Sequence, residues 1–191
     1  MSRGSWRWFV VAAGLLLAGG CGLVGGDDDG AGVAAAAPCP EAPSGRMPLP
    51  GFGEIAIRLV SGDGAVTDAC ALLADDEPAR AQGLMGQRDL RGYDAMLFRW
   101  PTPSTTRFYM RDTIVPLTVA FFAADGRFVS AADMPPCPLE APDCPRYGAA
   151  APYQFAIEVP MGRLEDLGGG PGSTLTFPAG AAATEAVSPP A

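Results

Sequence analysis

Residues 117–132 read LTVAFFAADGRFVSAA, and this stretch predicts a β-hairpin that decides the class of the fold. Two apolar runs of strand length, Leu117–Phe122 and Phe128–Ala132, flank the dipeptide Asp125-Gly126. Asp-Gly favours the backbone angles that a tight turn between antiparallel strands requires. We therefore expect the hairpin to belong to a β-rich domain.

More strands are predicted on both sides of the hairpin. Residues 54–60 alternate apolar and polar side chains, and the turn at 61–64 leads to a hairpin partner at 66–74. Further runs of strand length are Ala95–Trp100, Arg107–Met110, Gln154–Val159 and Ser173–Phe177. Asp75–Pro78 is typical of a helix start, Gly83 limits that helix to about two turns, and one more helical turn fits 163–167. The pattern predicts a mainly β fold, a single jelly-roll-like sandwich or small barrel of about eight strands with one or two short helices.

The N-terminus has the order of an export signal. Arg3 and Arg7 precede an apolar run from Trp8 to Ala18, which is shorter than the roughly 20 residues that cross a bilayer. Two glycines then lead to Cys21, which resembles the lipobox cysteine of bacterial lipoproteins, although Ala18 stands where leucine is usual. A stray cysteine after an ordinary signal peptide is the alternative. We expect an extracytoplasmic protein that the lipid on Cys21 anchors to the cell membrane.

Composition divides the chain into four parts. Residues 1–20 form the predicted signal peptide, and 21–50 the lipidated cysteine with a tether rich in Gly, Ala, Pro and Asp. Such a tether cannot bury enough apolar surface to offset its ordering entropy, so we expect it to be disordered. The β-rich domain is predicted at 51–178, and a second disordered segment at 179–191.

Four cysteines remain once Cys21 is acylated, an even number that suits an oxidising compartment. Cys137 and Cys144 lie in a short proline-rich loop, where we expect a structural disulfide rather than a metal or redox site. Cys39 and Cys70 are the candidates for a second bridge. Four cysteines allow three pairings, so this second pairing stays open.

Missing residue types restrict the chemistry. The chain has no His and no Lys, which excludes Ser-His-Asp catalysis, His-based zinc sites and Schiff-base chemistry by this chain alone. The net charge of −8 and the lack of a basic stripe argue against a nucleic-acid partner. We expect no metal, no cofactor and no catalytic residue.

Several motifs together resemble one family, the domain of unknown function 192. They are Arg80–Met85, Met96–Phe98, Phe108–Thr113 with Pro116, Leu117 and Phe121, then Asp125-Gly126, the cysteine loop followed by Tyr147, and Ala156–Gly162. The resemblance covers about residues 53–178 and implies one β-rich, jelly-roll-like domain, often exported, without implying an activity. Gln87, Ala95 and Asp112 depart from the usual arginine, glycine and asparagine. We interpret the Met and Phe residues of these motifs chiefly as core.

Four polar residues are harder to explain by packing. Arg111, Asp112 and Thr113 stand between apolar segments, and Glu158 lies within an apolar strand. One interpretation is a buried Arg111–Glu158 pair that fixes strand register. The other is a polar pocket floor that binds a ligand, in which Arg111 faces an anionic group and Asp112 and Thr113 supply hydrogen bonds.

Three classes of function remain open. The first is a non-catalytic module that binds a small molecule, glycan or peptide at the cell envelope. The second is a structural or interaction component of the envelope, with an unknown protein partner. The third, least favoured, is a hydrolase that uses Asp112 and Glu158 as a carboxylate pair. A pocket that contains both carboxyls would favour the enzyme, and a pocket without that pair would favour binding.

Overall fold

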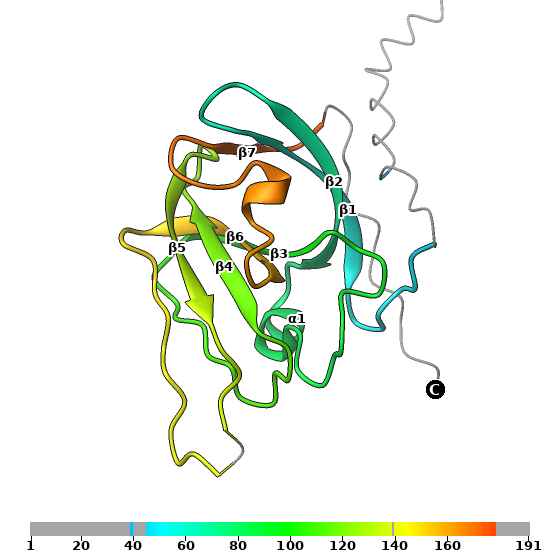
Figure 1. Ribbon diagram of the computed structural model, residues 1–191, viewed down its shortest axis with the longest axis vertical. Coiled ribbons are helices and arrows are strands. Elements are labelled where there is room, and N and C mark those ends of the chain that lie inside the picture. Colours follow the sequence, from blue (N-terminus) through cyan, green and yellow to red (C-terminus); the bar gives the residue numbers. More distant parts are fainter. Residues whose placement is uncertain (1–38, 40–44, 139, 179–191) are drawn as a thin grey trace, which may run out of the picture. The chain divides into compact units, whose positions relative to one another are not determined.

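A computed structural model describes residues 39, 45–138 and 140–178, and it places seven strands in one curled sheet (Figure 1). In chain order these are β1 (Gly53–Val60), β2 (Val66–Ala74), β3 (Ala95–Ser104), β4 (Leu117–Phe122), β5 (Phe128–Met134), β6 (Tyr153–Pro160) and β7 (Thr174–Thr176). The strands lie in the order β5-β4-β6-β3-β2-β1-β7. The predicted mainly β fold is confirmed, and of its two predicted forms the small barrel describes this sheet better.

The predicted strand at Arg107–Met110 does not form. Its backbone pairs with the rest of the chain at one isolated bridge, where Phe108 and Tyr147 exchange hydrogen bonds of 2.8 and 2.9 Å. The apolar pattern there has another cause, because Met110 is 1% exposed and packs onto a face of the sheet. An apolar run that covers a sheet has the same composition as a strand within it.

One pair of neighbouring strands is parallel, and this pair determines what covers the sheet. All pairings are antiparallel except that of β2 with β3. Parallel neighbours need a long crossover connection, and residues 75–94 supply it with helix α1 (Glu77–Gln82). Asp76 caps this helix by accepting a 2.7 Å hydrogen bond from the Ala79 N–H, and Gly83 ends it, as the sequence predicts.

The two edge strands meet at one end of the sheet. The Leu175 N–H donates to the Gly126 carbonyl at 2.8 Å, and the Phe128 N–H donates to the Ser173 carbonyl at 3.0 Å. Gly126 has φ of 81°, and a Cβ there would lie 2.0 Å from the Leu175 carbonyl oxygen. The glycine of the predicted Asp125-Gly126 turn is therefore required twice, by the hairpin and by this closure.

Curling gives the sheet two apolar cores, one on each face. We call the first the enclosed core; six strands contribute buried side chains to it, among them Ile57, Phe122 and Leu175, and Phe128 of the seventh, β5, packs against its edge. Side chains from both edge strands can join one cluster only on the concave face. The second, the outer core, lies on the opposite face beneath α1 and the loops, and it includes Met96, Phe98 and Phe121. The short helix η1 (Glu165–Leu167) contributes Leu167 to the edge of the enclosed core.

Both candidate disulfides form. Cys39 bonds to Cys70 on β2, with their Cα atoms 5.1 Å apart, and Cys137 bonds to Cys144 with a separation of 5.6 Å. Residues 45–50, which we expected to belong to the tether, pack on the domain instead: Leu49 is 6% exposed and joins the outer core. The Met47 N–H also donates to the Arg91 carbonyl at 3.0 Å.

The predictions for the two ends of the chain concern residues that the structure does not describe. The predicted signal peptide, Cys21, and the C-terminal segment 179–191 lie outside the described residues. Within the part of the chain that is described, no helix is both long enough and apolar enough to span a membrane.

Candidate functional site

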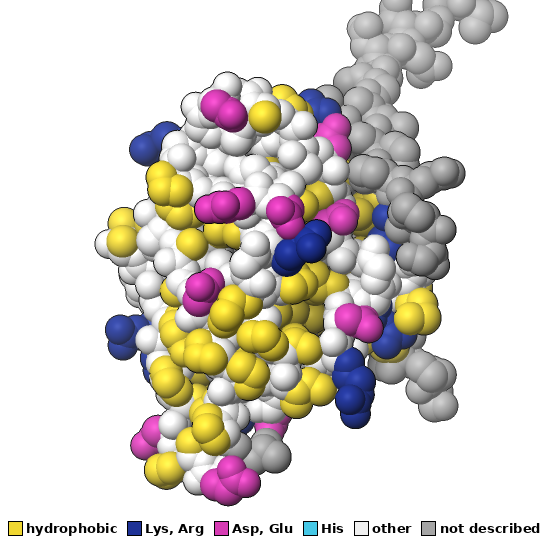
Figure 2. All heavy atoms as spheres, viewed as in Figure 1, with side chains coloured by type: hydrophobic (Ala, Val, Ile, Leu, Met, Phe, Trp, Pro, Cys, Tyr) yellow, Lys and Arg dark blue, Asp and Glu magenta, His cyan; other side chains and the backbone are white. Residues whose placement is uncertain are grey.

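A cavity of about 370 Å³ opens on the outer core. One wall is the crossover, from Glu77 to Met85, and the other is the β3–β4 connection, which includes Phe108, Tyr109 and Thr113. Phe98, Trp100 and Glu158 reach it from the sheet between these walls. The volume falls within the range of small-molecule sites. Hydrophobic side chains gather on the lower half of the face in Figure 2, over α1 and the loops beyond β4.

Glu158 is the unusual residue of this cavity. Along β6, Ile157 and Val159 point into the enclosed core, so the alternation of the strand turns Glu158 to the outer face. Its direct neighbours across the sheet are Met96 on β3 and Val119 on β4. Glu158 is 5% exposed, and no described residue donates a hydrogen bond to its carboxyl or forms an ion pair with it.

The surroundings determine the protonation state of this carboxyl. Burial among apolar neighbours raises the pKa of Glu158 to about 8, because desolvation penalises the charged form. No partner offsets that penalty. Near neutral pH the carboxyl is therefore mostly protonated, and it can donate one hydrogen bond or ionise when a positive charge arrives.

Aromatic rings form the side of the cavity next to Glu158. Phe98 follows Met96 by two residues on β3 and so lies diagonal to Glu158 on the same face. The ring of Phe98 stacks on that of Trp100 at 6.3 Å and meets the Phe108 ring edge-on at 4.9 Å. These contacts support one another and fix the orientation of the wall.

Arg80 lies at the edge of the cavity and is already engaged. Its guanidinium donates to the carbonyls of Asp75 and Arg99, the latter at 3.0 Å, and lies 5.5 Å from the centre of the Trp100 ring. The helix that carries Arg80 is thereby tied to β3. One face of the aromatic wall already holds a cation in this way.

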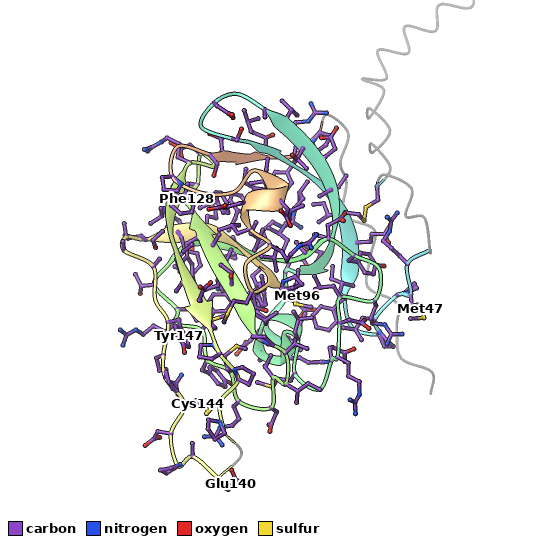
Figure 3. All side chains as sticks on the ribbon, viewed as in Figure 1. Met47, Met96, Phe128, Glu140, Cys144 and Tyr147 are labelled. Atoms are coloured by element: carbon purple, nitrogen blue, oxygen red, sulfur yellow. A yellow bond between two sulfur atoms is a disulfide. The ribbon has the colours of Figure 1, made fainter. Side chains whose placement is uncertain are left out.

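The cysteine loop supports the far wall. Figure 3 shows Glu140 at its tip, with Cys144 and then Tyr147 progressively closer to the sheet. The bridge from Tyr147 holds Phe108 in place, and Arg146 lies 4.9 Å from the centre of the Tyr109 ring. Two motifs that are far apart in the sequence, the aromatic segment at Phe108 and the cysteine loop followed by Tyr147, are therefore in contact in the structure.

The four predicted site residues are divided. Thr113, 6% exposed, and Glu158 both line the cavity. The side chains of Arg111 and Asp112 are exposed and do not line it. Arg111 donates to the Pro142 carbonyl at 3.3 Å, so the buried Arg111–Glu158 pair is not formed.

Asp112 has a backbone role that explains its position. Its φ is 56°, a left-handed conformation that Asn and Asp adopt more readily than most residues, and its carbonyl accepts from the Gly86 N–H at 2.9 Å. The polar character of this motif comes from a turn, which connects the two walls of the cavity. The asparagine expected at this position in the family suits the same conformation.

Sequence reasoning missed part of the site. Arg80, Trp100 and Tyr109 line the cavity, but none of them was predicted as a site residue. Phe98 and Phe108, interpreted as core, are both packing residues and cavity lining. The available signal was weak: an arginine and a tryptophan in segments whose pattern is otherwise structural.

Among the described residues, the potential metal ligands that come together do not form a metal site. In the described residues, one set of potential ligands converges, Cys39, Glu54 and Cys70, but both sulfurs belong to a disulfide. The remaining carboxylate of Glu54 accepts a 2.8 Å hydrogen bond from the Tyr93 hydroxyl. Desolvation and this hydrogen bond raise the pKa of Tyr93 to about 12. The cluster is a structural contact.

These features define a small, disulfide-containing β-domain of an oxidising, extracytoplasmic compartment, with a ligand-sized cavity on one face. The chain belongs to the DUF192 family ("Uncharacterized ACR, COG1430"), whose model matches residues 59–177. No curated protein matches the chain.

Two solved structures are similar. One is a "putative transcription regulator" from Sinorhizobium meliloti 1021, with 27% identity and a TM-score of 0.58, over 70% of this chain and 98% of that one. The other is a protein of unknown function from Novosphingobium aromaticivorans DSM 12444, with 27% identity and a TM-score of 0.56, over 76% and 96% of the two chains.

Proposed function

We propose that the protein is a lipid-anchored, extracytoplasmic binding protein that holds a small molecule in the cavity above the outer core. The observation that carries this proposal is the unpartnered carboxyl of Glu158 within an aromatic-lined cavity. The Glu158 side chain is mostly buried, and its oxygens face the cavity without a protein partner. A poorly solvated carboxyl without a partner costs stability. A ligand that satisfies the carboxyl accounts for its retention there.

The arrangement supports binding rather than hydrolysis. A carboxylate pair would need Asp112 beside Glu158, and the exposed side chain of Asp112 does not line the cavity. Glu77, the other carboxyl of the lining, is exposed on α1. General acid–base work by two buried carboxyls is thus not what this cavity favours.

The description of the Sinorhizobium protein as a transcription regulator does not suit this chain. A regulator of transcription acts on nucleic acid, which attracts proteins through basic surfaces. This chain has a net charge of −8, and its disulfides suit a compartment outside the cytoplasm. Both observations favour a ligand of another kind.

The anchor is proposed from the sequence around Cys21 and can be tested separately. The Cys21→Ser protein should no longer partition into the detergent phase, because its acylated thiol is lost. Globomycin should cause precursor to accumulate for the wild type and not for Cys21→Ser. A wild-type protein that is exported without lipid would contradict the anchor and leave the cavity proposal intact.

Binding is tested with a thermal-shift scan of the full-length protein against sugars, peptides and metabolites of the envelope. A ligand at 100 times its dissociation constant stabilises the folded state by about 2.7 kcal/mol, which is readily detected. Ala81→Trp places a ring on an exposed lining position and should remove the shift. Ala124→Trp, in the exposed hairpin turn away from the cavity, is the matched control.

Two outcomes would count against a binding role. A ligand that protects both tryptophan variants equally binds somewhere else. A scan without any hit, combined with a surface whose substitution disrupts an envelope complex, would favour a structural or interaction role instead.

A further inference from the structure

We infer that the cavity accepts a small organic cation, whose ammonium group pairs with Glu158 and contacts the aromatic wall formed by Phe98, Trp100 and Phe108. This inference rests on the proposed binding role and adds the chemical class of the ligand. The inference specifies the charge of the ligand group that pairs with Glu158. The cavity volume of about 370 Å³ leaves room for a substituent on the ammonium group.

The first argument is charge. Glu158 is a buried acid with no cation beside it among the described residues, and a buried carboxylate is stable when it is paired. Arg80, the half-buried cation of the lining, is held instead by two backbone carbonyls and the Trp100 ring. Arg107 also lines the cavity, but its side chain is exposed. A positive charge that pairs with Glu158 would therefore come from the ligand.

The second argument is the wall. The faces of aromatic rings attract cations, and recognition of alkylated ammonium groups commonly combines several rings with a nearby carboxylate. Trp100 already has a guanidinium 5.5 Å from its ring centre, on the side of α1. Phe98 and Phe108 meet at a ring separation of 4.9 Å, and Phe98 lies diagonal to Glu158 across the sheet. Rings and acid thus face one space.

A neutral ligand is the competing class, and pH separates the two. The cation requires the ionised carboxyl, whereas a neutral hydrogen-bond acceptor requires the protonated one. Because burial raises the pKa of Glu158 to about 8, cation affinity should rise about 50-fold from pH 6 to pH 8 and then level off. Affinity for a neutral acceptor should fall over the same range.

Four other titratable groups line the cavity. Those that line it with Glu158 are Glu77 and Arg80 on α1, and Arg107 and Tyr109 on the β3–β4 connection. The strand neighbours Met96 and Val119 do not titrate. Glu77 is exposed, and the guanidinium groups remain charged over this pH range. The chain has no histidine that could produce the same profile.

The test compares two probes of equal shape, choline and its uncharged analogue 3,3-dimethylbutan-1-ol. Calorimetric titration of the full-length protein in nonionic detergent at pH 8 should show choline binding at least tenfold more tightly. Titrations at pH 6 in buffers of different ionisation enthalpy should show release of about one proton per choline bound. Glu158→Gln should reduce the preference for choline to less than about threefold, and Glu165→Gln, at an exposed carboxyl of η1 outside the cavity lining, should leave it unchanged.

Each outcome decides the inference. Equal affinity for the two probes, or choline affinity that falls with rising pH, overturns the cation class while the binding role stands. Absence of binding by either probe also overturns it, and the thermal-shift scan then decides the binding role independently. An unchanged preference in Glu158→Gln, with a melting temperature at least that of the wild type, would place the cation elsewhere.

Discussion

The two cores of the sheet differ in what they contain. The enclosed core is built from aliphatic and phenylalanine side chains of six strands, with Phe128 of β5 at its edge, and its buried members have no ionisable group. The outer core is covered by loops and a two-turn helix. It contains tyrosine, methionine and a disulfide-bonded cysteine, and Glu158 lines the cavity on the same face. The curled sheet itself covers the enclosed core. The outer core is instead covered by the connections between strands, which leave a cavity.

Hydrogen bonding separates Glu158 from the other buried polar residues. Thr118 donates to Asp133 at 2.6 Å, Ser173 donates to the Gly170 carbonyl at 2.7 Å, and Thr113 has a longer contact of 3.4 Å to the Arg111 carbonyl. Of the four buried polar residues in the described chain, Glu158 is the one whose side chain has no hydrogen-bond partner, and its oxygens remain open to the cavity, since no fully buried side-chain oxygen of the described residues lacks a partner. The comparison leads us to predict that substitutions in the enclosed core chiefly reduce stability, whereas a substitution of Glu158 chiefly affects the proposed binding.

The largest expected effect tests this division with two phenylalanines. Phe122→Ala removes a fully buried ring from the enclosed core and should lower the free energy of unfolding by about 3–5 kcal/mol. Phe108→Ala removes a half-buried ring at the cavity wall and should cost about 1–2 kcal/mol, because solvent can fill the space. Urea unfolding of both variants measures the difference. Equal losses would mean that the outer core is as important for stability as the enclosed one.

The next effect concerns the pH dependence of stability. The folded state holds the Glu158 proton with a pKa of about 8 and the unfolded state with its ordinary value near 4.5. Between these values the folded state binds more protons than the unfolded state. The contribution of Glu158 to the free energy of unfolding is therefore complete below the lower pKa and decreases as pH rises, by at most about 1.4 kcal/mol per pH unit.

Glu158→Gln should remove this slope. The wild type and the variant should have similar stabilities at pH 5, and the variant should be more stable by about 4 kcal/mol at pH 9. Denaturant unfolding of both proteins from pH 5 to pH 9 gives the difference, in which other titrating groups cancel. Parallel profiles would show that the carboxyl is solvated or paired and would remove the basis of the candidate site.

A smaller effect tests how the cavity wall is held. Replacing Cys137 and Cys144 by serine removes the disulfide that closes a loop between residues seven apart in the sequence. The free energy of unfolding should fall by about 2–3 kcal/mol if the bridge acts through chain entropy. The Cys39→Ser, Cys70→Ser pair, with a separation of 31 residues, should cost about 1 kcal/mol more. Thermal unfolding of both double variants gives the order. A larger loss for the short loop would indicate that it packs more extensively than its exposed residues suggest.

The smallest effect distinguishes this site from the buried ion pair considered from the sequence. The side chain of Arg111 is exposed and makes one hydrogen bond among the described residues, to the Pro142 carbonyl, so Arg111→Met should change stability by less than about 1 kcal/mol. In a double-mutant cycle with Glu158→Gln at pH 9, the coupling energy should be below about 0.5 kcal/mol. Coupling of several kcal/mol would mean that the two side chains do pair in solution.

Sequence reasoning predicted the elements of the fold more completely than the site. The period of two in residues 54–60, the Asp125-Gly126 turn and the capping Asp76 each act over a few residues, and all three predictions are confirmed. The strand at 107–110 was wrong because covering a sheet and belonging to it require the same apolar residues. Of the four site residues predicted from their polarity, Thr113 and Glu158 line the cavity, and their role in binding stays a prediction.

The sequence by itself determined the mainly β class, the hairpin, both disulfide candidates and the acid within an apolar strand. Those properties follow from local spacing, turn chemistry and cysteine number. The tertiary structure decided that β2 and β3 are parallel, and therefore that a crossover covers one face and leaves a cavity. It also decided that Arg111 points away from Glu158. Which side chains meet across a sheet depends on strand order, and strand order is set by packing of the whole domain rather than by neighbouring residues.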